Sequence, residues 1–299
     1  MSNVAVISDV AEEKNATSHV IALRSRATSA SVEPSRSEKL HRSRRPARPT
    51  VSVIVPTLNE AANIPFVLST LAQITAEVII VDGRSRDDTV RVATALRPDV
   101  IVVREQRRGK GAALRAGFAA ATGDIIVMLD SDGSADGREI PRFIEALQAG
   151  ADFAKGTRFA LGGGSADITG ARQLGNAALS GLVNVVFGAT FTDLCYGYNA
   201  FWRDCLPYLN VDCDGFEVET LLNVRAVKSG LRIAEVPSFE SNRIHGSSNL
   251  HAIKDGLRVL RTIVSECRPN QYLRSAAQPR RSSVPEPAVA TPISHGGQS

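Results

Sequence analysis

The sequence has few cysteines and no pattern that would join them. Its four cysteines are Cys195, Cys205, Cys213 and Cys267, and no two stand in a C-x-x-C arrangement. The sequence therefore predicts neither a structural zinc site nor a disulfide framework. Free thiols are typical of a reducing compartment, so we expect a cytoplasmic protein.

Long apolar runs are also missing. No stretch approaches the ~20 apolar residues that a membrane-spanning helix needs. Near the N-terminus, Asp9, Glu12 and Glu13 stand where a secretory signal would carry its apolar segment, so we expect no signal peptide. We therefore expect a protein that is soluble or peripheral, in the cytoplasm or at the inner face of the membrane.

Charge of one sign is concentrated only near the N-terminus. The net charge is +4, with 43% hydrophobic and 22% charged residues, as in an ordinary globular chain. Residues 1–49 are basic, mixed with Ser and Pro and free of aromatics, which predicts a disordered basic leader. No recognition motif accompanies this charge, so we expect no nucleic-acid partner; attraction to an anionic membrane is the functional alternative. Residues 268–299 predict a disordered tail and leave 50–267 as a single domain of unknown oligomeric state.

Strand and helix signals alternate through the first half of that domain. Apolar runs that predict strands are Val51–Val55, Glu77–Val81, Val100–Val103 and Ile125–Leu129. Segments of helical periodicity separate them, and such alternation predicts parallel strands with right-handed crossovers. We therefore predict an α/β fold with a mostly parallel sheet flanked by helices.

The second half of the domain is less regular. We expect a strand within Phe153–Phe159, helices over Arg172–Phe187 and Phe216–Ser229, and a strand over Leu231–Val236.

A last segment, Leu250–Cys267, is amphipathic. Its apolar stripe consists of Ile253, Leu257, Leu260 and Ile263. Core packing of a final helix and docking on a membrane surface both explain such a stripe.

The most informative motif is Asp130-Ser131-Asp132, which directly follows the predicted strand Ile125–Leu129. Open α/β sheets bind ligands at the carboxyl ends of their strands, and alternate residues of a strand share one side. Two hard carboxylate ligands suit Mg²⁺ or Mn²⁺, ions that usually also bind substrate phosphates. An Asp-x-Asp also occurs in solvated turns, so neighbouring motifs decide its meaning.

Polar residues follow two of the other predicted strands. Asp82 directly follows the predicted strand Glu77–Val81, and its carboxylate can accept hydrogen bonds from a nucleobase or a ribose. Capping of the next helix is the alternative role. Lys110, between Gly109 and Gly111, opens a helix where cations and free N–H groups favour phosphate. Arg104 stands where a P-loop needs glycine, so this is no P-loop, and a solvated helix start is the alternative.

Further cations follow the metal motif. Arg158, Arg172 and Arg243 lie in loop or helix-start contexts, where arginines either bind anions or are simply exposed.

Several of these segments, in this order, resemble family 2 glycosyltransferases with the GT-A fold. The resemblance runs through Val53–Glu60, Asp82–Thr89, Gly109–Gly111 and Asp130–Asp132. Segments that extend it toward the dolichol-phosphate mannosyltransferase-like branch are Lys155–Phe159, Asp193–Asn199, Glu235–Pro237 and Arg243–Asn249.

The resemblance implies a role for each matching residue. Residues implied in nucleotide-sugar binding are Pro56, Asn59, Glu60, Asp82, Lys110 and Asp130. Asp130 and Asp132 would hold Mg²⁺ or Mn²⁺ on the diphosphate, and Arg158, Arg172 and Arg243 would face acceptor or donor phosphate. Two departures fall on these contacts. Gly83-Arg84-Ser85 follows Asp82 where the family usually has a second acidic residue before Gly-Ser, and Gly133-Ser134 replaces an apolar–polar pair.

The implied reaction is inverting, metal-dependent transfer of a hexose from a donor of the GDP-mannose or UDP-glucose type. A polyprenyl phosphate acceptor is already anionic and needs no general base, and its use would require contact with a membrane. A hydroxyl acceptor, as in polysaccharide or glycolipid synthesis, needs a carboxylate base. Asp193 is the first candidate for that base, with Glu217 and Glu219 after it; bracing of its own loop is the structural alternative for Asp193.

Other classes of protein fit the motifs less well. A nucleotidyltransferase would carry a glycine-rich segment after the first strand, where Pro56–Glu60 stands instead. A non-catalytic sugar-nucleotide-binding protein would not need both carboxylates of the metal motif together with the arginines.

Overall fold

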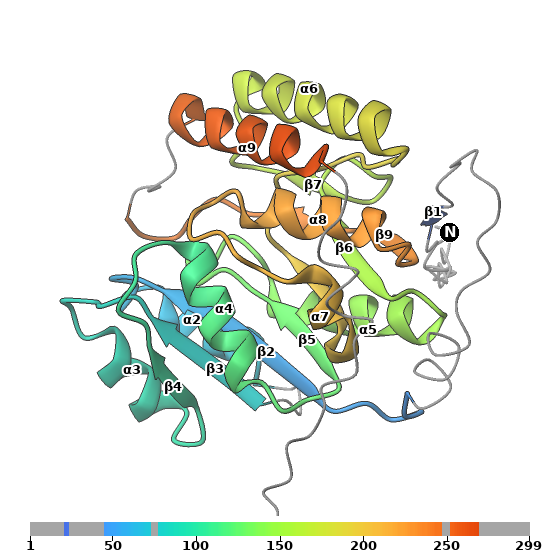
Figure 1. The fold of residues 1–299 in the computed structure, drawn as a ribbon. Coiled ribbons are helices and arrows are strands. Elements are labelled where there is room, and N and C mark those ends of the chain that lie inside the picture. The colour runs from blue at the N-terminus through green and yellow to red at the C-terminus, as the bar shows by residue number, and fades with distance from the viewer. Residues whose placement is uncertain (1–20, 24–44, 73–76, 247–251, 269–299) are drawn as a thin grey trace, which may run out of the picture.

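A mixed sheet forms the centre of the protein (Figure 1). The computed structural model describes residues 21–23, 45–72, 77–246 and 252–268. The sheet has eight strands in the order β1-β9-β6-β8-β5-β2-β3-β4. Its strands are β1 (Ile21–Leu23), β2 (Val51–Thr57), β3 (Glu77–Asp82), β4 (Ile101–Arg104), β5 (Ile125–Met128), β6 (Phe153–Thr157), β8 (Asn199–Trp202) and β9 (Ile233–Pro237). A separate parallel pair joins β7 (Gly164–Ser165) to β10 (Phe239–Glu240).

Helices cover this sheet. The α-helices are α2 (Ile64–Thr70), α3 (Thr89–Leu96), α4 (Lys110–Ala120), α5 (Ile140–Gln148), α6 (Gly170–Phe187), α7 (Leu206–Leu209), α8 (Val218–Lys228) and α9 (Ala252–Glu266), and the 3₁₀ turns are η1 (Gly137–Glu139) and η2 (Arg203–Cys205). Helix α4 packs on β2 and β3, while α5 packs on β6, β8 and β9. Helices α6 and α9 lie side by side and contact α8 (Figure 1). Within the described residues, no helix combines the length and apolarity needed to cross a bilayer.

The first half confirms the predicted α/β alternation. Strands β2, β3, β4 and β5 are mutually parallel. The apolar runs of β2, β3 and β5 are buried because helices cover the sheet, whereas the edge strand β4 is partly exposed. Their carboxyl ends meet at one edge, so the residues that follow β2, β3 and β5 lie close together.

The second half differs from the prediction in its central strand. Strand β8 lies between β5 and β6 and runs antiparallel to both. Its four residues are all buried, and the sequence pattern predicts no strand there. A short run flanked by loops gives too little periodicity to reveal a strand whose position depends on its neighbours. The prediction also missed α5.

The structure corrects the prediction that the last helix carries a single apolar stripe. In α9, Val259 and Ile263 are buried, whereas Leu257 and Leu260 are exposed. The Ile253 side chain lies outside the described residues. The apolar residues of α9 therefore point in two directions, toward the core and toward solvent, and do not form one stripe.

Ordered structure begins before residue 50. Arg45 forms ion pairs with Asp152 at 2.7 Å and with Asp204 at 2.8 Å, and its guanidinium lies 4.9 Å from the centre of the Trp202 ring. Strand β1 pairs with β9 at the far edge of the sheet. These residues belong to the segment predicted as a disordered leader. Most of that segment lies outside the described residues, as does the predicted tail from 269 onward, so the domain limits stay a prediction.

Gly117 lets α4 approach the sheet, and its replacement tests this packing. A Cβ at Gly117 would collide with the Ile54 side chain, so we expect Gly117→Ala to lower the free energy of unfolding by about 1–3 kcal/mol through overpacking. Gly181 on α6 is the matched control, because a Cβ there meets nothing within 4 Å. Gly181→Ala should be stabilising by up to ~1 kcal/mol through helix propensity. Urea denaturation of both variants measures the difference; equal effects would contradict close packing at Gly117.

Candidate active site

One pocket gathers residues from both halves of the protein. It lies at the carboxyl ends of β2, β3 and β5 and is closed by the start of α4 and by α6, α8 and α9. The predicted site residues that line it are Pro56, Asn59, Glu60, Lys110, Asp130, Asp132, Arg158, Arg172 and Arg243. Asp82 and Asp193 do not line it.

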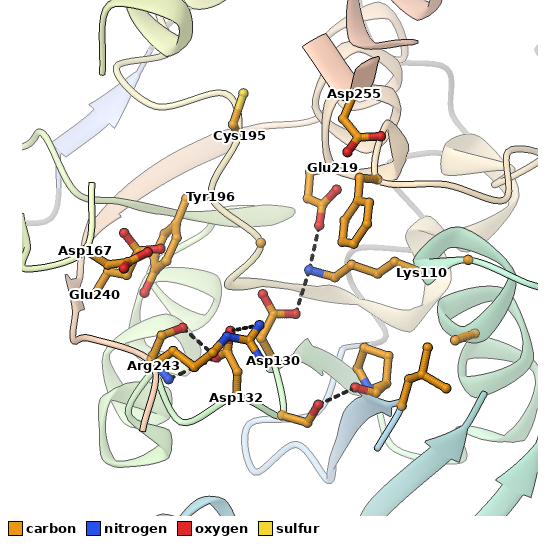
Figure 2. Close-up of a pocket in the computed structure, with 18 of the residues that line it drawn as sticks. Lys110, Asp130, Asp132, Asp167, Cys195, Tyr196, Glu219, Glu240, Arg243 and Asp255 are labelled. Carbon is orange, nitrogen blue, oxygen red and sulfur yellow. Dashed lines mark hydrogen bonds and ion pairs between the residues drawn. The ribbon is translucent and has the colours of Figure 1, made fainter. Parts of the chain in front are cut away.

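Lys110 connects two carboxylates from different halves of the fold (Figure 2). Its Nζ lies 2.5 Å from Asp130 Oδ1 and 2.6 Å from Glu219 Oε1. Burial alone would lower the pKa of Lys110, but the two carboxylates raise it above its ordinary value, so the amine stays charged. Burial raises the pKa of Glu219, and Lys110 offsets only part of that rise. Lys110 therefore stabilises negative charge at the floor of the pocket.

Arg243 forms the second bridge. Its guanidinium lies 3.1 Å from Glu60 Oε1 and 2.9 Å from Asp132 Oδ2. Burial raises the pKa of Glu60, which a hydrogen bond from Asn63 and the charge of Arg243 partly offset. Asn63 also holds the backbone of His245 by two hydrogen bonds. The segment after β10 is thereby fixed beside the metal motif.

The Asp130–Asp132 pair has the chemistry of a divalent-ion site. Asp132 Oδ1 accepts hydrogen bonds from the Ser134 amide and hydroxyl, which orients its carboxylate. In the described part of the chain, no three His, Cys, Asp or Glu side chains come together as a ready ligand set. The two carboxylates fit an ion such as Mg²⁺ that takes its remaining oxygens from water and from a bound diphosphate.

Asp193, the first candidate for a general base if the acceptor is a hydroxyl, lies outside the pocket lining and in an ion pair. Asp193 is fully buried, and both of its carboxylate oxygens accept hydrogen bonds from Arg158. Burial opposes ionisation of Asp193, but these bonds keep its pKa below the ordinary value, so it is a poor proton acceptor. Asp193 instead orients Arg158, a structural role that differs from the predicted alternative of bracing its own loop.

Arg158 lines the pocket, and two carboxylates fix its guanidinium in place. Besides Asp193, it pairs with Glu240 at 2.9 Å, and its guanidinium lies 5.0 Å from the centre of the Tyr196 ring. Figure 2 shows Glu240, Tyr196 and Asp167 together on one side of the pocket. Arg172, at the start of α6, pairs with Asp167 at 2.9 Å. Arg158 and Arg172 thus lie at the end of the pocket formed by α6 and β10, with Arg243 nearer the metal motif.

The opposite end of the pocket is formed by the loops after β2 and β3. The Pro56 carbonyl accepts a hydrogen bond from the Ser131 hydroxyl at 2.8 Å, which ties β2 to the metal motif. Asp82 is buried, and its Oδ1 accepts a hydrogen bond from the Ser85 amide at 3.0 Å. Asp82 thus shapes the loop whose next residue, Gly83, lines the pocket. The proposed contact of Asp82 with a nucleobase stays a prediction.

Two acidic residues of the pocket were not assigned to it from the sequence. Glu240 lies three residues beyond Pro237, and no motif marked it. Glu219 was named only as a reserve base, although it lies on α8 among Val218, Leu221 and Leu222. A carboxylate that is buried in such an apolar helix needs a charged partner, so the apolar residues around Glu219 indicate a nearby buried cation.

Comparison with known proteins agrees with this geometry. The family model described as Glycosyl transferase family 2 matches residues 52–206. A Haloferax volcanii protein named glycosyltransferase AglJ is 31% identical over 214 residues, which cover 71% of this chain and 70% of the relative. The polyprenol monophosphomannose synthase of Mycolicibacterium smegmatis is 32% identical over 219 residues, or 69% of this chain and 82% of the relative.

Solved structures show the same fold. The glucosyl-3-phosphoglycerate synthase of Mycobacterium tuberculosis, in complex with Mn²⁺, UDP-glucose and phosphoglyceric acid, superposes with a TM-score of 0.60 at 28% identity. The match covers 75% of this chain and 82% of that one. With the pocket at the carboxyl edge of its sheet and the family match over residues 52–206, the chain belongs to glycosyltransferase family 2 as an enzyme of the dolichol-phosphate mannosyltransferase-like group.

Proposed function

We propose that this enzyme transfers a hexose from a nucleotide-diphosphate sugar to a polyprenyl phosphate, with inversion at the anomeric carbon. The observation that carries the proposal is the order of groups along the pocket. The strand order β6-β8-β5-β2-β3 places Asp130 and Asp132, which follow β5, between the loops of β2 and β3 and Arg158, which follows β6. A donor bound at the first end and an acceptor phosphate at the second would meet beside the acidic pair.

The names of the relatives support this choice of substrates. Besides the Mycolicibacterium smegmatis enzyme, the undecaprenyl-phosphate mannosyltransferase of Micrococcus luteus is 31% identical over 212 residues. The Mycobacterium tuberculosis neighbour binds Mn²⁺ and UDP-glucose. We therefore include GDP-mannose and UDP-glucose as donor types and Mg²⁺ or Mn²⁺ as the ion.

The reaction is a single displacement. An oxygen of the acceptor phosphate forms a bond to the anomeric carbon, the bond from that carbon to the diphosphate breaks, and the electron pair leaves with the nucleoside diphosphate. A divalent ion held by Asp130 and Asp132 would neutralise the charge that grows on the leaving group. Lys110 and Arg243 keep the two carboxylates in place through their ion pairs.

A phosphate acceptor fits the arrangement of carboxylates better than a hydroxyl acceptor does. The phosphate oxygen is anionic near neutral pH, so no proton has to be removed. Asp193, the leading candidate for a base, is buried and bonded to Arg158. Arg158 and Arg172 can position the phosphate by charge-assisted hydrogen bonds.

A lipid acceptor requires contact with a membrane, and the surface of α6 and α9 suits it. Apolar side chains exposed on these two helices are Leu174, Leu182, Val185, Val186, Leu257, Leu260 and Val264. Lys254 and Arg261 are exposed on α9 and would favour anionic lipid. Both helices also line the pocket, so a lipid phosphate could reach the arginine end from this surface. We propose that the enzyme works here as a peripheral protein at the cytoplasmic face of a membrane.

Transfer of labelled sugar from GDP-mannose, UDP-glucose, UDP-glucuronate and UDP-N-acetylglucosamine into polyprenyl phosphate tests the reaction. We expect labelling that needs Mg²⁺ or Mn²⁺, stops with a chelator, and falls at least about a hundredfold in Asp132→Asn. Asp136→Asn is the matched control, because Asp136 lies in the same loop and caps η1 outside the pocket. Metal-dependent donor hydrolysis without lipid product would point to a hydroxyl acceptor instead. No turnover of any donor would refute the proposal.

Asp193→Asn separates the structural role of Asp193 from a role as base. We expect the folded variant to lose less transfer rate than the about 10²–10⁴-fold that loss of a general base would cost, because Asp193 acts only through the orientation of Arg158. Its free energy of unfolding at neutral pH should fall by about 3–5 kcal/mol, because the variant leaves Arg158 without its main partner.

This stability difference should depend on pH. The pKa of Asp193 is lowered in the folded protein, so its contribution is present above the unfolded value of about 4 and is lost as the pH falls through the lower folded pKa. Urea denaturation of both proteins at neutral and acidic pH should show the difference narrowing in acid. Asp204→Asn, which weakens an ion pair with Arg45 away from the pocket, is the control for an ordinary lost ion pair.

The membrane surface is tested by adding a charge to α6. Val185→Glu should weaken sedimentation of the protein with anionic phospholipid vesicles, because Val185 is 85% exposed on the apolar surface of that helix. Leu96→Glu on α3 is the matched control, since Leu96 is 55% exposed on a helix that does not line the pocket. Equal vesicle binding by both variants would contradict docking through α6.

A further inference from the structure

Arg84 has an unusual backbone conformation. Its φ is 71°, in the left-handed region that residues with a side chain rarely adopt. The other residues of the described chain that have a side chain and a positive φ are Asn59 and Asn210, and asparagine tolerates this conformation far better than arginine does. Strained backbone of this kind concentrates at functional sites, where the surrounding structure maintains it.

Hydrogen bonds on both sides hold the loop around Arg84 in place. The Gly83 amide donates to the Thr57 carbonyl at 2.8 Å, and the Ser85 amide donates to Asp82 Oδ1 at 3.0 Å. Asn59 then connects the loops after β2 and β3. Its amide donates to the Ser85 hydroxyl at 2.9 Å, and its side-chain oxygen accepts from the Arg86 amide at 2.7 Å. These bonds fix the backbone while leaving the Arg84 side chain outside the network.

That side chain lines the pocket. Among the described residues, no carboxylate pairs with the Arg84 guanidinium, and the same holds for Arg86 and Arg108 of this pocket. Arg158, Arg172 and Arg243 are ion-paired. Arg84 is also exposed. Its guanidinium N–H groups are therefore free to bind a ligand that enters the pocket.

The position of Arg84 in the sheet indicates which part of the ligand it meets. The strand order β5-β2-β3 places the end of β3 two strands away from Asp130 and Asp132, which follow β5. Neighbouring strands lie ~4.8 Å apart, so this separation is about 10 Å. A diphosphate at the acidic pair would be too short to span it, whereas a nucleoside extends about that far. Arg84 thus lies at the nucleobase end.

We propose that Arg84 determines base specificity by donating hydrogen bonds to a carbonyl of the donor's nucleobase. The proposal rests on the proposed function, because it assumes a nucleoside diphosphate in this pocket. Guanidinium groups are donors only, and they pair with carbonyl oxygens such as O6 of guanine. Guanine and uracil offer such carbonyls, whereas adenine offers an amino group in their place. Arg84 therefore favours guanine or uracil over adenine.

Calorimetric titration of GDP, UDP and ADP into the full chain with Mg²⁺ tests this contact. Arg84→Gly should weaken binding of the preferred guanosine or uridine nucleotide by about 5- to 100-fold and leave ADP binding nearly unchanged. Glycine adopts a left-handed conformation without strain, so the melting temperature should stay the same or rise. Arg91→Ala is the matched control, because Arg91 is an exposed arginine on α3 that pairs with Asp88 outside the pocket.

Each other result overturns a different statement. Unchanged binding of GDP and UDP in Arg84→Gly would refute the contact. An equal loss for ADP would assign Arg84 to phosphate and not to the base. A lower melting temperature together with weaker binding would assign Arg84 a structural role. If the unmodified protein binds none of the three nucleotides, the proposed donor itself is wrong, and the inference falls with it.

Discussion

The ion pairs of Lys110 are the interaction on which the pocket depends. Lys110 begins α4 in the first half of the chain, Asp130 follows β5, and Glu219 lies on α8 in the second half. Burying these charges costs several kcal/mol for each ion unless they are paired. Their mutual pairing therefore draws α8 against the carboxyl edge of the parallel strands and encloses the acidic pair.

Two arginines of the pocket, Arg243 and Arg158, follow the same rule of local pairing. Arg243 balances Glu60 and Asp132, and Arg158 balances Asp193 and Glu240. These ion pairs fix each arginine side chain before a ligand binds, so little conformational entropy is lost on binding. The arginine end can receive an anion with its donors already oriented, and the acidic pair can exchange part of its pairing with Arg243 and Lys110 for a metal ion.

The sequence predicted the parts of the structure that depend on local patterns. Apolar runs such as Ile125–Leu129 predicted the parallel strands. Nine of the eleven residues assigned from motifs or from loop and helix-start positions line the pocket. The prediction failed where position depends on distant contacts. Strand β8 is recognisable only through its pairing with β5 and β6, and the burial of Asp193 follows from Arg158, which is distant in sequence. Glu219 and Glu240 reach the pocket only through helix packing and the pairing of β10 with β7.

The direction of β8 has a consequence for how this enzyme can change. Because β8 runs antiparallel to β5, the segment that enters β8 arrives at the same edge where β5 ends. This entry segment brings Cys195, Tyr196 and Gly197 to the pocket, on the other side of β5 from the loops that follow β2 and β3. The two walls of the pocket are thus encoded by separate stretches of the chain. The segment between α6 and β8 can therefore change in sequence without altering the strands β2, β3 and β5 that form the other side of the pocket.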